Sequence, residues 1–248
     1  MQKIILITGG SRGIGAATGR LAAGAGYAVV FSYLKAREVA EGLCAEIRDA
    51  GGAACAIQAD VALEADVVRL FETADREVGK LTALVNNAGV AEHQSRCEEM
   101  SAARLSRVFA TNVIGSFLCA REAVKRMSTR HGGHGGGIVN VSSAASRLGS
   151  PGEFVDYAAS KGAIDTFTIG LAKEVAGEGI RVNAVRPGVI YTDIHASYGE
   201  PGRVDRVKDS VPMRRGGDAE EVAKAILWLL SDDASYSTGA FIDVSGGR

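Results

Sequence analysis

Short apolar segments alternate with longer amphipathic ones along this chain, and the alternation limits the folds that it can adopt. Within the longer segments, apolar residues recur at helical spacing, as Val67, Phe71 and Ala74 do in residues 64–78. Parallel strands joined by helical crossovers form a doubly wound sheet, so the sequence predicts an α/β fold with its ligand site beyond the carboxyl ends of the strands. The predicted buried strands cover residues 4–8, 28–32, 54–58, 83–86, 138–142 and 181–185.

Length and composition favour a single domain over residues 1–248, because a chain that is 46% hydrophobic can bury one large core. Its 28 Lys and Arg nearly balance its 29 Asp and Glu, so we expect neither nucleic acid nor an anionic membrane as a partner. The early apolar stretch of residues 4–7 is too short for a signal or a membrane span, which favours a cytoplasmic location. The cysteines are scattered and predict neither zinc nor disulfides: Cys44, Cys55, Cys97 and Cys119.

Residues 131–137, His-Gly-Gly-His-Gly-Gly-Gly, are the low-complexity run of the sequence. They follow a helix expected to end near Arg130 and precede a strand expected to begin at Ile138. We interpret the run as a flexible connection. Its two histidines lack a third ligand nearby, so no metal site is expected.

A glycine-rich turn follows the first predicted strand and opens a helix. Glycine lets the chain turn sharply and lets a pyrophosphate approach backbone N–H groups, while the helix N-terminus adds partial positive charge. The spacing of Gly9, Gly13 and Gly15 differs from the ordinary G-x-G-x-x-G fingerprint, and a tight turn without ligand remains the alternative. The cofactor contacts predicted here are Gly9, Ser11, Arg12, Gly13, Ile14 and Gly15.

The end of the second strand carries no acidic residue to accept the ribose hydroxyls of NAD. Tyr33, Lys35 and Arg37 stand there instead and, with Arg12, can meet the 2′-phosphate of NADP. We therefore expect NADP to be preferred, with NAD possible. The alternative is that Lys35 and Arg37 are solvated surface charges.

Asp60 and Val61, which follow the third strand, are further expected cofactor contacts. The Asp60 carboxylate can accept a bond from the adenine amine. A helix cap or a turn is an equally good reading of Asp60.

Tyr157 and Lys161 are four residues apart, on one face of a predicted helix that continues to Val175. A phenol can protonate the alkoxide formed by hydride transfer to a carbonyl, provided that a cation stabilises its charged form. Out of context such a pair is more often a surface pair. The strand at residues 138–142 ends nearby in Ser142 and Ser143, and we choose Ser143 to polarise the substrate oxygen.

Six motifs in this order resemble those of the short-chain dehydrogenase/reductase family: Thr8-Gly9-x-x-x-Gly13-x-Gly15, Asn86-Asn87-Ala88-Gly89, Asn112, Ser143, Tyr157-x-x-x-Lys161 and Pro187-Gly188. The resemblance extends from Lys3 to Gly247 and is greatest to bacterial oxidoreductases that are glucose 1-dehydrogenase-like or uncharacterised. It implies a single-domain Rossmann fold, with a mostly parallel seven-stranded sheet flanked by helices.

The resemblance also implies roles for the site residues. Tyr157 is the acid and base, Lys161 binds the nicotinamide ribose and lowers the tyrosine pKa, and Ser143 orients the substrate oxygen. Asn112 supports a water chain, unless it only kinks its helix. Further cofactor contacts are implied at Asn87, Ala88, Gly89, Pro187, Gly188 and Thr192.

The spacing from Ser143 to Tyr157 is one residue longer than the family pattern. Either the chain carries an insertion near residues 150–152, or the assignment of the active serine is off by one, which leaves the choice of Ser143 over Ser142 open.

The polar segment 191–217 corresponds to a substrate lid, in which specificity is expected to reside. Its many charges suit a polar or anionic substrate, or they only keep an exposed lid soluble. Residues expected to bound the substrate are His195, Tyr198, Arg203, Arg206, Lys208, Arg214 and Arg215 in the lid and Arg147, Glu153 and Phe154 opposite it.

The resulting expectation is an NADP(H)-dependent oxidoreductase that transfers a hydride to or from a small carbonyl compound or secondary alcohol. One alternative is a 3-oxoacyl-(acyl carrier protein) reductase, and another is a cofactor-binding sensor without catalysis. The resemblance further implies a homotetramer formed through the helices at 102–127 and 164–175 and through the last strand.

Overall fold

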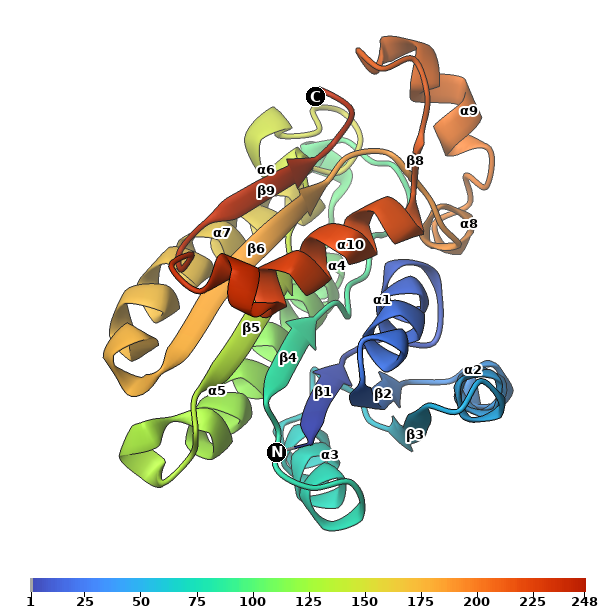
Figure 1. The fold of residues 1–248 in the computed structure, drawn as a ribbon. Helices are drawn as coiled ribbons and strands as arrows, with labels where there is room; N and C mark the ends of the chain where they lie inside the picture. Colours follow the sequence, from blue (N-terminus) through green and yellow to red (C-terminus); the bar gives the residue numbers. More distant parts are fainter. Residues whose placement is uncertain (1) are drawn as a thin grey trace.

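Seven strands of the computed structural model, which describes residues 2–248, pair into one sheet in the order β3-β2-β1-β4-β5-β6-β9 (Figure 1). Every neighbouring pair is parallel. The predicted doubly wound Rossmann fold is therefore confirmed, and β9 is the seventh strand that the family resemblance implied. The strands are β1 (Lys3–Ile7), β2 (Tyr27–Tyr33), β3 (Ala53–Gln58), β4 (Ala83–Asn86), β5 (Gly136–Val141), β6 (Ile180–Pro187) and β9 (Phe241–Val244).

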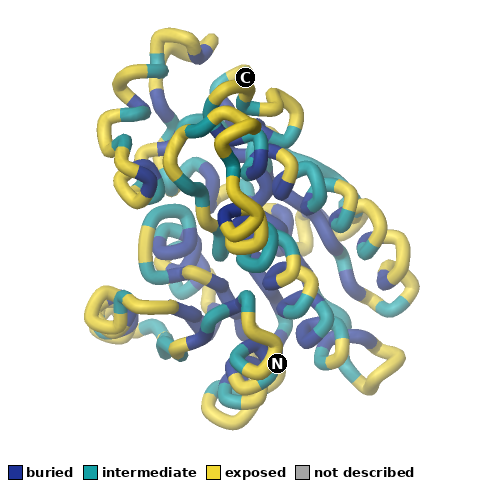
Figure 2. The backbone as a smooth tube through the Cα atoms, turned by 180° about the vertical axis from the view of Figure 1, so that it is seen from behind, coloured by how far each residue is buried: buried dark blue, intermediate teal, exposed yellow. Residues whose placement is uncertain are grey.

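Helices cover both faces of this sheet, because its strands carry apolar side chains on both sides. In β1, Ile4 and Leu6 point into the core beneath α3 (Glu64–Glu77), α5 (Gly115–Met127) and α7 (Val155–Val175). Ile5 and Ile7 point into the opposite core, beneath α1 (Gly13–Gly24), α2 (Arg37–Asp49) and α10 (Ala219–Leu230). Figure 2 shows the buried strands enclosed by helices whose outer surfaces are exposed.

The chain reverses its direction of travel across the sheet at β1, which lies between β2 and β4. It first runs outward through β2 and β3 and then returns to β4 on the other side of β1. At such a reversal the loops leaving neighbouring strands separate and leave a crevice at the carboxyl edge. This edge is where the short helices α8 (Ile194–Ser197) and α9 (Arg203–Val207) lie (Figure 1).

The segment 191–217 is more ordered than its composition suggests. Its ends are joined by a small parallel pair, β7 (Ile190–Tyr191) with β8 (Gly217–Asp218). Between them lie α8, α9 and a 3₁₀ turn, η5 (Lys208–Ser210). The segment therefore leaves the main fold and returns to it at one point.

The remaining short elements connect the main ones. A 3₁₀ turn, η1 (Cys97–Glu99), precedes α4 (Ala102–Phe109), and a π-helical turn, η2 (Ala110–Ile114), joins α4 to α5. The others are η3 (Thr129–His131), α6 (Ala145–Leu148), η4 (Ala176–Glu178) and η6 (Asp232–Ala234).

Only residues 132–135 of the glycine run form the predicted connection, because His131 ends η3 and Gly136 begins β5. Strand β5 begins at Gly136, two residues earlier than expected, because Gly136 and Gly137 pair with the neighbouring strands. A Cβ atom on Gly136 would lie 2.4 Å from the Thr82 carbonyl oxygen, and one on Gly135 2.5 Å from that of Gly179. These glycines permit close backbone packing.

Candidate functional site

A cavity of about 1120 Å³ runs along the carboxyl edge of the sheet and into the space beneath α8 and α9. This volume is slightly above the usual range for small-molecule sites, as a dinucleotide plus a substrate would require. Of the predicted site residues, those lining it are Gly9, Ser11, Arg12, Gly13, Ile14, Tyr33, Lys35, Asp60, Val61, Asn87, Ala88, Gly89, Ser143, Tyr157, Lys161, Pro187, Gly188 and Thr192. Gly15 and Asn112 do not line the cavity.

The glycine turn is shaped by its backbone. Gly9 and Gly13 have positive φ values of 59° and 52°, which L side chains rarely adopt. A Cβ on Gly15 would lie 2.7 Å from Asn87 Nδ2, so this glycine permits close packing within the turn. The cofactor contact expected at Gly15 stays a prediction.

Thr8 and Asn87 hold this turn against the end of β4. Thr8 Oγ1 accepts hydrogen bonds from the backbone N–H groups of Asn87 and Ala88, both at 3.0 Å. Asn87 Nδ2 in turn donates to the carbonyl oxygens of Thr8 and Gly9 at 2.9 and 3.0 Å. Asn87 thus holds the glycine turn in place, and its motif alone did not reveal this role.

The features of the turn fit a dinucleotide. The α1 helix begins at Gly13 without a side-chain cap, so its first N–H groups remain free to meet an anion. Arg12 and Lys35 line the cavity, and within residues 2–248 neither has an ionic partner. Arg37 lies outside the cavity and pairs with Glu41 at 2.7 Å, which favours the solvated-charge alternative for this residue.

Asp60 lies in the cavity wall and also forms a turn. Its Oδ1 accepts from the backbone N–H of Ala62 at 3.0 Å, while its own N–H donates to Asp66. Its second carboxylate oxygen has no partner among the described residues, so the turn role leaves room for a ligand contact.

Tyr157 and Ser143 meet in the cavity. Burial raises the pKa of Tyr157, and a hydrogen bond with Ser143 partly offsets that rise. Ser143 Oγ accepts from the Ala145 N–H at 3.1 Å, which leaves its proton free to donate. Since the two hydroxyls are hydrogen-bonded to each other, a substrate oxygen that replaces this bond can accept from both.

Ser142 is turned away from Tyr157. Its hydroxyl donates to Asp165 Oδ1 at 2.6 Å and is almost fully buried. The backbone of Ser150 has φ +45°, between positive-φ glycines at 149 and 152, in a tight turn that can hold the additional residue. The geometry therefore favours Ser143 and an insertion near residues 150–152.

Lys161 lies one helical turn after Tyr157, with its Nζ 5.6 Å from the centroid of the Tyr157 ring. Nζ donates to the Val141 carbonyl oxygen at 2.7 Å, and the residue is 4% exposed. Burial lowers the pKa of Lys161 to about 8, and nearby Asp165 opposes the shift. The family resemblance implied that Lys161 lowers the pKa of Tyr157, but in this arrangement burial dominates and the net shift of Tyr157 is upward.

Asn112 lies at the centre of the π-helical turn η2 and is fully buried. Its Oδ1 accepts from the Val90 N–H at 2.8 Å, and its Nδ2 donates to the Val90 carbonyl and to Ser160 Oγ, both at 3.0 Å. Asn112 thus interrupts its helix and braces the loop after β4 against α7. Single π-turns of this kind occur frequently at functional sites.

A buried ion pair next to Tyr157 was not predicted from the sequence. Arg104 of α4 binds Asp156 through Nε at 2.7 Å and Nη2 at 3.2 Å, and its Nη1 donates to the His93 carbonyl. Burial raises the pKa of Asp156, but hydrogen bonds led by Arg104 outweigh this and lower it. The pair fixes the first turn of α7, on which Tyr157 stands.

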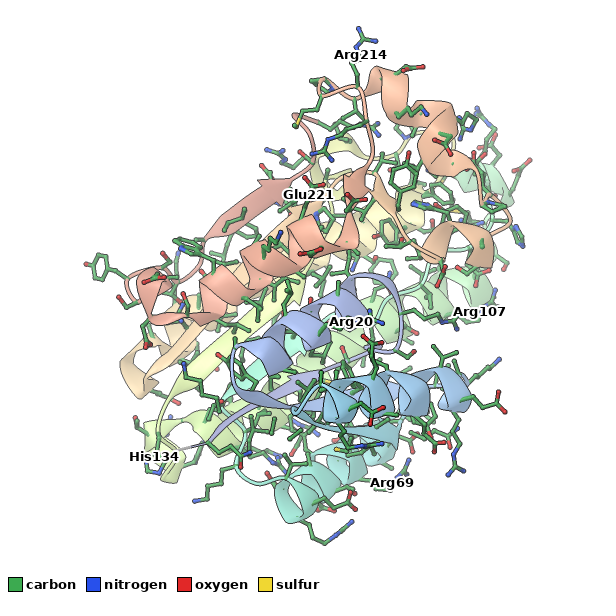
Figure 3. All side chains as sticks on the ribbon, turned by 45° about the vertical axis from the view of Figure 1, so that its right-hand side comes forward. Arg20, Arg69, Arg107, His134, Arg214 and Glu221 are labelled. Carbon is green, nitrogen blue, oxygen red and sulfur yellow. The ribbon has the colours of Figure 1, made fainter. Side chains whose placement is uncertain are left out.

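Most cations of the lid are paired with carboxylates of the lid or of α10. Arg206 pairs with Glu200, Lys208 with Asp205 and Arg215 with Glu221. Arg214 stands at the tip of the lid and points away from the protein (Figure 3). These four cations do not line the cavity, and neither does Arg147, so they do not form an anion site.

Of the lid residues expected to bound the substrate, His195, Tyr198 and Arg203 do line the cavity. Arg203 Nη1 binds Glu200 at 2.8 Å, and its Nη2 binds Glu153 across the cavity mouth. With two carboxylates on it, Arg203 offers no free charge to an anionic substrate.

Across residues 2–248 no group of three or more His, Cys, Asp or Glu side chains is placed to hold a metal ion. His134 lies at the amino-terminal end of β5, far from the lid (Figure 3). The helices of this described part include none that is both long and apolar enough to cross a bilayer.

Comparison with known proteins identifies the class of this fold and site. A family model described as enoyl-(acyl carrier protein) reductase, of the adh_short_C2 type, matches residues 9–248. The chain is 61% identical over 245 residues to the uncharacterized oxidoreductase YgfF of Escherichia coli strain K12, with 99% of each covered.

Two solved structures share the fold with a TM-score of 0.90. One is a short-chain dehydrogenase/reductase of Serratia marcescens, solved as a double mutant, at 34% identity with 99% of this chain and 97% of that one covered. The other is a 3-ketoacyl-(acyl-carrier-protein) reductase of Brucella melitensis complexed with NADH, at 33% identity with coverage of 99% and 98%.

The chain belongs to the short-chain dehydrogenase/reductase family. It is an oxidoreductase acting on CH–OH groups or carbonyls with a nicotinamide cofactor. The comparisons therefore favour the enzyme over the alternative of a cofactor-binding sensor without catalysis.

Proposed function

We propose that this protein is an NADP(H)-dependent reductase or dehydrogenase of small carbonyl compounds and secondary alcohols, with Tyr157 as its proton donor and acceptor. The observation that carries the proposal is the hydrogen-bonded pair of Tyr157 and Ser143 in the wall of a cavity that the glycine turn also lines. Both hydroxyls are uncharged and can donate to the same substrate oxygen.

The proposed chemistry divides the work among these residues. A bound nicotinamide cofactor supplies or accepts the hydride. Ser143 donates to the substrate carbonyl oxygen and polarises it, and Tyr157 transfers its proton to that oxygen as it becomes an alkoxide. Lys161 binds the cofactor ribose and returns a proton to Tyr157, since a lysine with a pKa of about 8 exchanges protons near neutral pH. Asn112 holds the Val90 loop and Ser160 in place around this path.

The preference for NADP over NAD rests on Arg12 and Lys35. Both line the cavity near the end of β2, and no carboxylate stands at that strand end to repel a 2′-phosphate. A charge-assisted hydrogen bond contributes about 1.5–3 kcal/mol, so each contact is expected to strengthen NADPH binding about tenfold or more.

Fluorescence titration with NADPH and NADH tests this preference. Lys35→Glu is expected to weaken NADPH binding at least about tenfold and to leave NADH binding nearly unchanged. Arg37→Glu is the matched control, because Arg37 lies outside the cavity, and it should alter neither affinity appreciably. Equal affinities of the wild type for both cofactors would refute the preference.

A 3-oxoacyl-(acyl carrier protein) reductase remains the enzymatic alternative, and a structural neighbour has a title of that kind. A carbonyl panel distinguishes the two activities. Small ketones as good substrates support the proposal, whereas reduction confined to acetoacetyl thioesters supports the alternative.

We also propose a homotetramer in a reducing, cytoplasmic setting. Four large apolar side chains are exposed on α4, η2, α5 and α7, which is the helical surface expected to mediate assembly. They are Leu105, Ile114, Phe117 and Ile169. A monomer at micromolar concentration in light scattering would refute the tetramer.

A further inference from the structure

His195 and Tyr198 form a buried pair over the substrate end of the cavity. They are 9% and 7% exposed, and both line the cavity that holds Tyr157. Tyr198 packs against Phe154, with ring centroids 5.0 Å apart, and Arg203 covers the same Phe154 ring at 5.0 Å. Tyr198 is thus held by ring contacts with both Phe154 and His195.

The backbone determines which nitrogen of His195 carries the proton. Nε2 lies 2.8 Å from the carbonyl oxygen of Ile190, and a carbonyl oxygen can only accept. Nε2 must therefore be protonated. Burial lowers the pKa of His195, so the ring is neutral near pH 7 and its Nδ1 is an acceptor.

The tautomer of His195 then determines the direction of the next hydrogen bond. Nδ1 contacts the hydroxyl of Tyr198, and since Nδ1 only accepts, Tyr198 must donate. Burial raises the pKa of Tyr198, so the hydroxyl keeps its proton for this bond. Tyr198 has no other hydrogen-bond partner within residues 2–248, and its oxygen lone pairs remain free.

The cavity therefore presents donors on one side and an acceptor on the other. Ser143 and Tyr157 can donate to the reacting oxygen, whereas Tyr198 can only accept. Tyr198 packs against Phe154, which lies three residues before Tyr157 at the start of α7, and both phenols line the same cavity. A substrate that satisfies both sides carries a carbonyl and, close to it, a hydrogen-bond donor.

We propose that Tyr198 determines specificity by accepting a hydrogen bond from a hydroxyl group on the carbon next to the reacting one, so that the preferred substrates are α-hydroxy ketones and the corresponding vicinal diols. The inference rests on the proposed function and adds its substrate class. A buried acceptor left unpaired by the wrong substrate is costly, which is why such sites discriminate strongly.

Three small ketones test the inference: hydroxyacetone, methoxyacetone and butanone. The first two both carry an oxygen that activates the carbonyl, but only hydroxyacetone can donate, so the ratio of their kcat/KM values isolates the hydrogen bond. We expect hydroxyacetone to be favoured over methoxyacetone, and Tyr198→Phe to lower this ratio about tenfold while changing kcat/KM for butanone less than about threefold.

Tyr191→Phe is the matched control, since Tyr191 lies at the base of the same segment, half exposed and outside the cavity. It should leave the ratio unchanged. His195→Phe frees the Tyr198 hydroxyl to donate and should move the preference toward methoxyacetone. A ratio that Tyr198→Phe leaves unaltered would overturn the inference and leave the proposed function standing.

Nitrogen NMR of the histidine rings gives a readout that does not depend on turnover. The chain has four histidines, so the His195 signals can be assigned by comparison with His195→Phe. A neutral ring protonated at Nε2 supports the inference, and protonation at Nδ1 overturns it. Failure of all three ketones to be reduced would refute the proposed function together with the inference.

Discussion

Replacement of Lys161 by methionine should change how the stability of the protein depends on pH. The lysine is buried, and its pKa falls from 10.5 to about 8. Each pKa unit corresponds to about 1.4 kcal/mol, so the charged lysine costs the folded state about 3 kcal/mol. Methionine fills a similar volume without charge but loses the hydrogen bond to the Val141 carbonyl, which contributes about 1 kcal/mol.

The sign of the pH effect follows from proton binding. Between pH 8 and pH 10.5 the unfolded chain keeps the lysine proton while the folded protein releases it, so stability rises with pH. Below pH 8 the full penalty is present. The variant should therefore be more stable than the wild type by about 2 kcal/mol near pH 7, and this advantage should disappear as pH approaches 10.

Urea denaturation from pH 6 to pH 10, without cofactor and at fixed protomer concentration, measures this difference. Lys173→Met is the control, because Lys173 lies on the exposed side of the same helix, and it should show the pH dependence of the wild type. A Lys161→Met variant that is less stable than the wild type by the same amount at every pH would refute the reasoning.

Two further predictions concern stability. Arg104→Met leaves the Asp156 carboxylate buried and unpaired, and it should lower the free energy of unfolding, measured by urea denaturation, by about 3–5 kcal/mol. Arg107→Met breaks an exposed pair and should lower it by less than about 1 kcal/mol. Equal losses would show that burial of the pair is unimportant. Gly136→Ala forces a Cβ against the Thr82 backbone and should lower the free energy of unfolding by about 1–3 kcal/mol. Gly42→Ala, in open space on α2, should raise it by about 0.5–1 kcal/mol. A stabilising Gly136→Ala would contradict the packing role of the glycines at 135–136.

The strands and the cavity wall could be predicted from the sequence because both follow local patterns. Strand-length apolar segments recur between helical ones, and parallel strands place their carboxyl ends at one edge. The family motifs therefore assigned Ser143, Tyr157 and Lys161 to one site.

What the sequence did not reveal depends on contacts between distant residues. Arg104 and Asp156 are 52 positions apart, and no periodic pattern links them. Gly136 resembles part of a flexible tract until the neighbouring Thr82 carbonyl shows why no side chain fits. Lys35 and Arg37 are alike in sequence, and only the start of α2 directs one into the cavity wall and the other toward Glu41.

The charges of the lid are a further case in which the sequence did not reveal the contacts that matter. Arg203, Arg206 and Lys208 suggested a polar or anionic substrate when counted as free cations. Their carboxylate partners neutralise them in the structure. What then distinguishes the substrate end of the cavity is an uncharged pair, His195 and Tyr198, whose hydrogen-bond direction depends on the Ile190 carbonyl.

The rate of ketone reduction by Tyr157→Phe, compared with the wild type under saturating NADPH, tests the central claim most directly. Phenylalanine keeps the buried ring and removes only the exchangeable proton, so cofactor affinity should be retained while kcat falls by about 10² to 10⁴-fold. A variant that binds NADPH normally and reduces ketones at the wild-type rate would contradict the assignment of Tyr157 as the proton donor.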